Sequence, residues 1–172
     1  INVSYSIGLK QVVLLEAFAV TSGYVIRATA GAVAIDVTPS PWLYVTTGAG
    51  ALFIILGRRF AEVRLAGDSA EEQRTVLKDY SGPFISQLLT LSAAAAWLSY
   101  TLYTVEATNL PDNNTMLFTL PLVTFGLFRY LYLLNNSEQA EVPEQLIVRD
   151  LPLVVSIISW VAVSTLVLLL NN

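Results

Sequence analysis

The chain has 172 residues, of which 55% are hydrophobic and 13% are charged, and its mean hydropathy is +0.62. A soluble domain carries about 25% charged residues, so this composition is typical of a membrane protein. Cysteine and histidine are both absent, which excludes disulfides, thiolate zinc sites, thiol nucleophiles and imidazole acid–base chemistry. Any chemistry must therefore use carboxylates, Lys, Arg, Tyr, Ser or a metal held by oxygen atoms.

Five segments are long and apolar enough to cross a bilayer, whose hydrocarbon core needs about 20 residues of helix. They run over residues 11–35, 41–57, 83–105, 116–134 and 151–170. Pro41, Pro83 and Pro152 lie in or beside the first turns of three segments, where a missing N–H costs little. The sequence therefore predicts an all-α, polytopic transmembrane helix bundle of five spans.

Basic residues are concentrated in alternate connections. Eight of the nine Lys and Arg residues lie at Lys10, in the 58–82 loop, or in and beside the 135–150 loop. The positive-inside rule places these parts in the cytoplasm, so we expect an integral protein of the cytoplasmic (inner) membrane. The chain begins with Ile1 and has no secretory signal pattern, and we interpret it as a fragment whose upstream part is missing.

Two ionisable residues interrupt the first segment. Glu16 and Arg27 are eleven residues apart, so they share one helix face, roughly 16 Å apart along the axis and too far to pair. We expect both to face the bundle interior or a wet cavity, with a site role favoured for Glu16. For Arg27, a structural arginine bound to carbonyls of neighbouring helices is an equal alternative. Gly23 and Gly31 flank Arg27 at four-residue spacing, which lets another helix approach closely.

The second segment ends in the sequence LGRRFAEVR at 56–64. In a continuing helix, Arg58 and Glu62 are i,i+4 neighbours at pairing distance, and Arg59 is expected to point elsewhere and stay unpaired. A guanidinium fork at the membrane surface suits a phosphate. Glu62 and Asp68 are candidate ligands for Mg²⁺, which takes carboxylates together with substrate phosphates. The alternative is a stop-transfer anchor with a solvated salt bridge.

Three further positions carry polar groups beside the spans. Lys10 follows Tyr5 just before the first segment. Taken alone, Lys10 is best interpreted as a snorkelling lysine at the membrane interface. Arg129 lies near the end of the fourth segment. Taken alone, it is best interpreted as a single cation within an interfacial belt of aromatic residues. Asp150 is predicted to be the N-cap of the last segment.

Six stretches together resemble a known family. They are YSIGLK at 5–10, GYVIRATAGAVAI at 23–35, SPWL at 40–43, LGRRFAEV at 56–63, PLVTFGLFRYLYL at 121–133 and VRDLPLVVSIISW at 148–160. Their order and spacing resemble the C-terminal half of the decaprenyl-phosphate phosphoribosyltransferases, a branch of the UbiA-type prenyltransferase superfamily. The resemblance spans nearly the whole chain.

The resemblance implies a nine-helix membrane fold, of which these would be the last five helices. It implies a main Mg²⁺–diphosphate motif, N-D-x-x-D, upstream of Ile1. In place of the superfamily's second aspartate-rich motif, this chain has R-R-x-x-E at Arg58, Arg59 and Glu62, which fits the phosphoribosyl branch. Glu16 stands where this branch often has Asp.

The implied reaction moves 5-phosphoribose from phosphoribosyl diphosphate to a polyprenyl phosphate and releases diphosphate. The implied partners are these two substrates, the lipid bilayer and the missing N-terminal half, without nucleic acid, and a homo-oligomer is possible. The implied metal is Mg²⁺, for which Glu62 and Asp68 are candidate ligands in this chain, and Glu62 could instead bind the ribose or orient Arg58. No catalytic residue is assigned, because the lipid phosphate is already ionised, and the fragment alone is expected to be inactive. The residues expected to bind substrate or phosphate are Tyr5, Lys10, Arg58, Arg59 and Arg129.

Two other functions compete with this one. A UbiA-type polyprenyltransferase acting on an aromatic acceptor would use a second D-x-x-x-D motif, which this chain lacks. A non-catalytic membrane module, such as a transporter half or a scaffold, would use Glu16 and Arg27 to line a transport path.

Overall fold

A computed structural model describes residues 14–66, 81–107, 110, 113–136 and 143–170. Within these residues the regular secondary structure consists of helices alone. In chain order they are α2 (Leu15–Ala34), α3 (Pro41–Ala66), α5 (Gly82–Glu106), the 3₁₀ helix η4 (Thr115–Thr119), α6 (Leu120–Asn136), α7 (Pro143–Arg149) and α8 (Leu151–Leu170).

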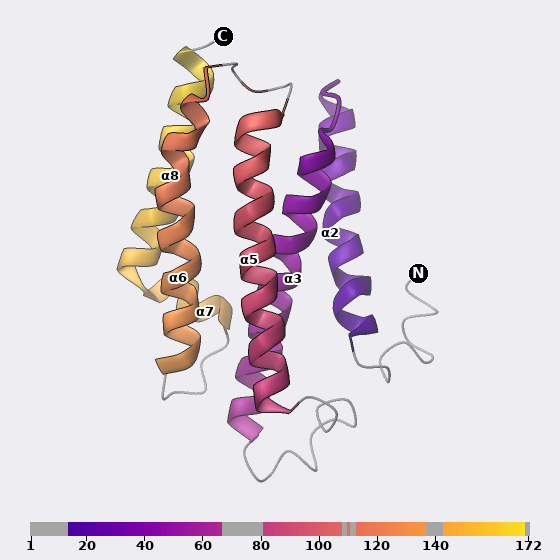
Figure 1. Ribbon diagram of the computed structural model, residues 1–172, viewed down its shortest axis with the longest axis vertical. Coiled ribbons are helices and arrows are strands. Elements are labelled where there is room, and N and C mark those ends of the chain that lie inside the picture. Colours follow the sequence, from indigo (N-terminus) through magenta and orange to yellow (C-terminus); the bar gives the residue numbers. More distant parts are fainter. Residues whose placement is uncertain (1–13, 67–80, 108–109, 111–112, 137–142, 171–172) are drawn as a thin grey trace.

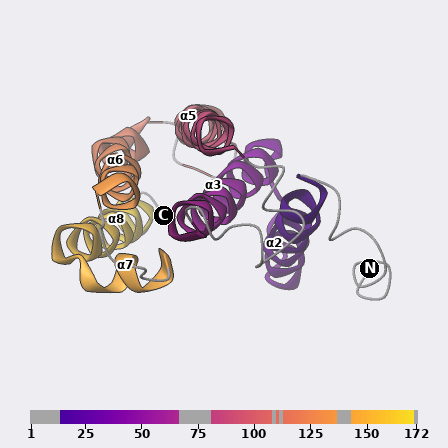
Figure 2. The same ribbon diagram turned by 90° about the horizontal axis from the view of Figure 1, so that it is seen from below.

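The five long helices run side by side and alternate in direction (Figure 1). Seen along the bundle, α3 occupies the middle, with α2 on one side and α5 and the α6–α8 pair on the others (Figure 2). Helix α3 packs against both α2 and α5, whereas α6 packs mainly against α8. The short helix α7 lies across the bundle end at which α8 begins.

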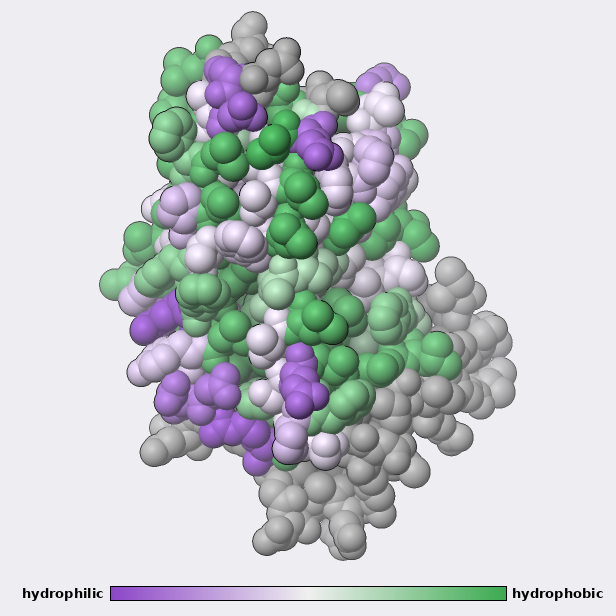
Figure 3. Space-filling view, viewed as in Figure 1, coloured by the Kyte–Doolittle hydropathy of each residue, from purple (hydrophilic) through white to green (hydrophobic). Residues whose placement is uncertain are grey.

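In the part of the chain that the structure describes, four segments are long and apolar enough to cross a membrane: Leu15–Ala34, Gly82–Glu106, Thr115–Asn136 and Leu151–Leu170. Their outward faces carry large hydrophobic side chains, and Figure 3 shows one such apolar surface. The predicted all-α polytopic bundle is therefore confirmed. The predicted second span, 41–57, lies inside α3, which is not among these four, so its crossing of the membrane stays a prediction.

Helix α3 is longer than the sequence pattern indicated. It continues through Gly57 to Ala66, so the continuing helix considered for LGRRFAEVR is confirmed, and the first nine residues of the predicted 58–82 loop are helical. The reason is local, because residues 58–66 contain neither Gly nor Pro and consist largely of good helix formers. The charged sequence therefore stands on a rigid helix, and the predicted site residues Arg58, Arg59 and Glu62 have fixed angular positions.

Helices α3 and α6 approach closely at Gly57. A Cβ atom at this glycine would lie 2.8 Å from the hydroxyl oxygen of Tyr130 and 3.1 Å from a methyl carbon of Leu134. Phe53, one turn earlier on α3, meets the Tyr130 ring edge-on with the centroids 5.3 Å apart. This contact belongs to a core that is formed by Phe53, Leu56, Phe60, Ile85, Leu89, Ala93, Tyr130, Leu134 and Leu153.

At the other end of the bundle, hydrogen bonds join the helices. The indole N–H of Trp160 donates to the hydroxyl of Tyr100 at 2.7 Å, and that hydroxyl lies 2.6 Å from the hydroxyl of buried Thr119. The indole N–H of Trp42, at the start of α3, donates to Glu106 at the end of α5 at 2.8 Å. These bonds tie α8, α5, η4 and α3 together.

Candidate functional site

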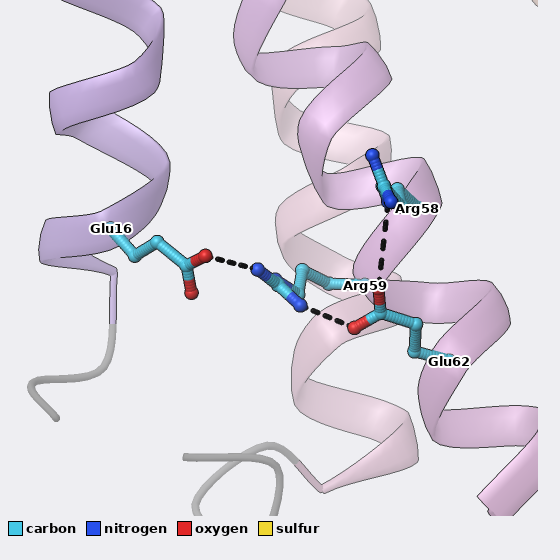
Figure 4. A network of polar contacts seen from close by, with 4 residues as sticks. All are labelled: Glu16, Arg58, Arg59 and Glu62. Atoms are coloured by element: carbon cyan, nitrogen blue, oxygen red, sulfur yellow. Dashed lines mark hydrogen bonds and ion pairs between the residues drawn. The ribbon is translucent and has the colours of Figure 1, made fainter. Parts of the chain in front are cut away.

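Arg59 lies between two carboxylates from different helices (Figure 4). One of its terminal nitrogens donates to Glu16 on α2, and the other donates to Glu62 on α3. The second oxygen of Glu62 lies 3.5 Å from the guanidinium of Arg58. The four side chains form a chain of alternating charges, which we call the Arg59 cluster.

Helix geometry explains the cluster. Glu62 follows Arg58 by four residues and Arg59 by three, so both guanidiniums lie on the side of α3 that carries Glu62. Glu16 lies in the first turn of α2, where a negative charge also interacts favourably with the helix dipole. Because α2 packs along α3, its first turn lies beside the last turns of α3.

The four side chains of the Arg59 cluster differ in how much of their surface is exposed to solvent. The side chain of Arg59 is 12% exposed, Glu16 18%, Glu62 29% and Arg58 56%. Arg59 is therefore the most enclosed charge, and its hydrogen bonds are charge-assisted in a partly dehydrated place, where they are strong. Two cations and two carboxylates cancel, so the cluster by itself offers an anion no net positive charge.

This geometry tests two predictions about LGRRFAEVR. The i,i+4 pairing of Arg58 with Glu62 is confirmed. The prediction that Arg59 stays unpaired is wrong, because i,i+3 spacing brings it to Glu62 and helix packing brings it to Glu16. Each carboxylate oxygen of Glu62 lies beside a guanidinium, which agrees with the alternative that Glu62 orients Arg58, and its role as an Mg²⁺ ligand stays a prediction.

Arg27 also differs from expectation. Its side chain is exposed on the outer surface of α2, and its guanidinium lies 5.5 Å from the centroid of the Tyr24 ring. It therefore does not face the interior that the described helices form. Within the described residues, no carboxylate forms an ion pair with Arg27.

Arg129 forms a second polar site with Asp150. Its Nε and one terminal nitrogen donate to the two carboxylate oxygens of Asp150 at 3.0 and 2.8 Å. One of these oxygens also accepts the backbone N–H of Leu153 at 2.9 Å, so the predicted N-cap role of Asp150 is confirmed. The hydrogen bonds from Arg129 are the main reason that the pKa of Asp150 lies below its ordinary value.

The pairing of Arg129 was not predicted, and neither was a contact of Arg64. The Arg64 guanidinium donates to the backbone carbonyl of Leu134 at the end of α6. Both bonds link residues far apart in sequence, and neither has a local spacing signal. Three predicted site residues lie outside the described residues: Tyr5, Lys10 and Asp68.

An apolar cavity of about 430 Å³ lies between α3, α5, α6 and α8. Its walls include Phe53 and Ile54 of α3, Tyr130 of α6, Ile147 of α7 and Trp160 of α8. Its volume is within the range of small-molecule pockets, and its lining suits a hydrocarbon group better than a polar one.

The sequence is similar to those of four curated proteins, all named decaprenyl-phosphate phosphoribosyltransferase. The protein of Mycobacterium tuberculosis H37Rv is 31% identical over 161 residues, covering 94% of this chain and 53% of the relative. That of Mycolicibacterium smegmatis is 29% identical over 169 residues, and that of Corynebacterium glutamicum is 25% identical over 163 residues. The chain is homologous to these transferases.

The resemblance inferred from the six sequence stretches is therefore confirmed. The chain spans about half the length of the curated relatives it matches. No protein-family model matches the chain.

Proposed function

We propose that the whole protein that contains this chain is a membrane glycosyltransferase. It transfers 5-phosphoribose from phosphoribosyl diphosphate to a decaprenyl-type polyprenyl phosphate. An oxygen of the lipid phosphate forms a bond to the anomeric carbon, and the bond from that carbon to diphosphate breaks, with the electron pair leaving on diphosphate. The names of homologues that match 94% of the chain support this reaction.

The proposal rests on the position of Arg59 between Glu16 and Glu62, in a chain that is homologous to phosphoribosyltransferases. Its guanidinium is held by two carboxylates from two helices and is thus oriented before any substrate arrives. Arg binds phosphates through two parallel hydrogen bonds, so a fixed guanidinium favours one orientation of a phosphoryl group. In this proposal Arg58 and Arg59 bind substrate phosphate, and Glu16 and Glu62 position them.

The neutral charge of the Arg59 cluster sets a requirement. Binding a diphosphate there needs additional positive charge, for which Lys10 and a bound Mg²⁺ are our candidates. Glu62 remains a proposed metal ligand alongside its contacts with the two arginines, and we propose that groups outside the described residues hold most of the metal–diphosphate unit. Tyr5 and Arg129 remain proposed substrate-binding residues, and Asp68 a proposed metal ligand.

The distribution of Lys and Arg along the chain suggests how the bundle is oriented in the membrane. We propose that the end of the bundle with the Arg59 cluster faces the cytoplasm, as the distribution of Lys and Arg predicts. A water-soluble donor then reaches the arginines from that side. The apolar cavity between α3, α5, α6 and α8 suits part of the polyprenyl chain.

The test is an assay of the purified whole protein in detergent with Mg²⁺, labelled phosphoribosyl diphosphate and polyprenyl phosphate. We expect the label to appear in a lipid that extracts into organic solvent. A parallel reaction contains an isoprenoid diphosphate and an aromatic acceptor. No labelled lipid in the first reaction from folded protein, or product only in the second, overturns the proposal.

A further inference from the structure

Helix α2 presents three different faces. Ala17 and Thr21 are buried against the bundle, and a Cβ on Gly48 of α3 would lie 3.6 Å from a methyl carbon of Val25. Phe18, Ile26 and Val33 point outward on a second side, where they are 55–61% exposed. Their size and exposure are typical of side chains that face lipid tails.

The third face of α2 consists mainly of small residues around one cation. At 100° per residue, it covers a sector of about 100° and starts one turn after Glu16 of the Arg59 cluster. A side chain at Gly23 or Gly31 would meet nothing within 4 Å, so this face is open around them. Its other members are Val20, Arg27, Ala30 and Ala34, of which only Val20 and Arg27 are larger than alanine.

Arg27 is poorly placed for a face that meets lipid. It lies seven residues before the end of α2 at Ala34, about 10 Å along the axis. Its guanidinium lies over the ring of Tyr24, which is one turn nearer the start of α2. A charge in a helix at such depth costs about 2.5–3.5 kcal/mol even on insertion scales, and such residues almost always face a partner.

We propose that this third face of α2 is the docking surface of a transmembrane helix that carries an acidic side chain at the depth of Arg27. The helix comes from the half of the relatives' length that this chain does not cover. Small residues let two helix backbones approach closely, whereas lipid tails have no need of them. A carboxylate opposite Arg27 supplies the counter-ion that the described residues lack.

A second copy of this chain fits the face less well. Subunits of a membrane dimer are related by an axis along the membrane normal, so both copies place Arg27 at the same depth. Two guanidiniums would then meet in a medium of low dielectric constant, where like charges repel strongly. The inference concerns packing and does not depend on the proposed reaction.

The test places a small photoreactive diazirine side chain at Ala30 in the whole protein in membranes. The matched control places it at Val33, on the side with large apolar residues. We expect Ala30 to cross-link within the same polypeptide, to a helix outside the 172 residues that carries Asp or Glu, and Val33 to cross-link to lipid. Cross-links of Ala30 to lipid only, to a second copy or to another protein overturn the proposal.

A steric experiment tests the same face separately. We expect Gly23→Leu to lower the Tm of the whole protein by about 5 °C or more, because the leucine overfills a close helix contact. Ile26→Leu, on the lipid-facing side of α2, is expected to leave the Tm unchanged. If Gly23→Leu is tolerated as well as Ile26→Leu, the third face is not a helix contact and the proposal fails.

Discussion

A Cβ atom added to Gly57 would lie 2.8 Å from the hydroxyl oxygen of Tyr130, so α3 and α6 meet where no side chain fits between them. We expect Gly57→Val to destabilise the fold by about 1–3 kcal/mol, because Tyr130 is buried and must shift. Thermal unfolding of the purified protein in detergent measures the change. The control is Gly50→Val on the same helix, where a Cβ meets nothing within 4 Å. Equal losses in the two variants would contradict this explanation.

Arg59→Ala is expected to lower turnover by about 100-fold or more, because it removes a positioned donor to a phosphoryl group. Arg59→Lys keeps the charge but loses the paired donors, so we expect an intermediate rate. Arg149→Ala, an exposed cation on α7, serves as the control and should retain wild-type turnover. Full activity of Arg59→Ala would return this arginine to the role of a membrane anchor.

The grading of exposure within the Arg59 cluster predicts unequal coupling energies. A double-mutant cycle with Glu16→Gln and Arg59→Met should give a coupling of about 0.5–3 kcal/mol in the free energy of unfolding. The same cycle for Arg58 and Glu62 should give about 0.2–1 kcal/mol, because Arg58 is 56% exposed. Denaturant titrations provide both values. A larger coupling for the Arg58 pair would be inconsistent with the structure.

The Arg129–Asp150 pair predicts a dependence of stability on pH. The folded-state pKa of Asp150 lies below its ordinary value of 3.8, so this carboxylate adds stability above that value and loses it as the pH falls through the lowered pKa. Asp150→Asn should therefore reduce the Tm at pH 7. The Tm difference from wild type should narrow as the pH falls from about 4 toward 2. A difference that stays constant would argue against the ionised pair.

Tyr100→Phe is expected to destabilise the bundle by about 1–3 kcal/mol, because it leaves the Trp160 N–H without its acceptor. Tyr132→Phe is the matched control, since that side chain is 55% exposed and its ring can still lie beside Arg129. Thermal unfolding compares the two. The network would be unimportant if both variants unfolded at the wild-type temperature.

The fold was largely predictable because each helix carries its own signal. Long apolar segments locate the helices, prolines mark first turns, and the Asp150 cap follows from its place before an apolar run. The end of α3 lies beyond the end of its apolar span at Gly57, because the charged residues that follow are also good helix formers. The helix propensity of residues 58–66 is high, and charge does not end a helix whose last turns can reach the polar membrane surface.

The site was predictable only where its contacts are local. The Arg58–Glu62 pair follows from a four-residue spacing. The Glu16–Arg59 pair spans 43 residues and depends on the rotation of α2 against α3, which no local pattern encodes. Arg129 and Asp150 are 21 residues apart and meet because α6 packs beside the start of α8. The cost of a charge within a membrane helix led us to expect Arg27 in the bundle interior. Its side chain is instead exposed and faces away from the described helices.

Helix α3 connects two polar contacts that lie far apart in the bundle. From Trp42 to Arg59 it is unbroken over about 26 Å, at 1.5 Å per residue. Each end is fastened to a different neighbour, Trp42 to Glu106 of α5 and Arg59 to Glu16 of α2. Gly57, where α3 meets Tyr130 and Leu134 of α6, lies two residues before Arg59. The Glu16–Arg59 contact and the Trp42–Glu106 contact are therefore joined by one continuous helix, with no loop between them.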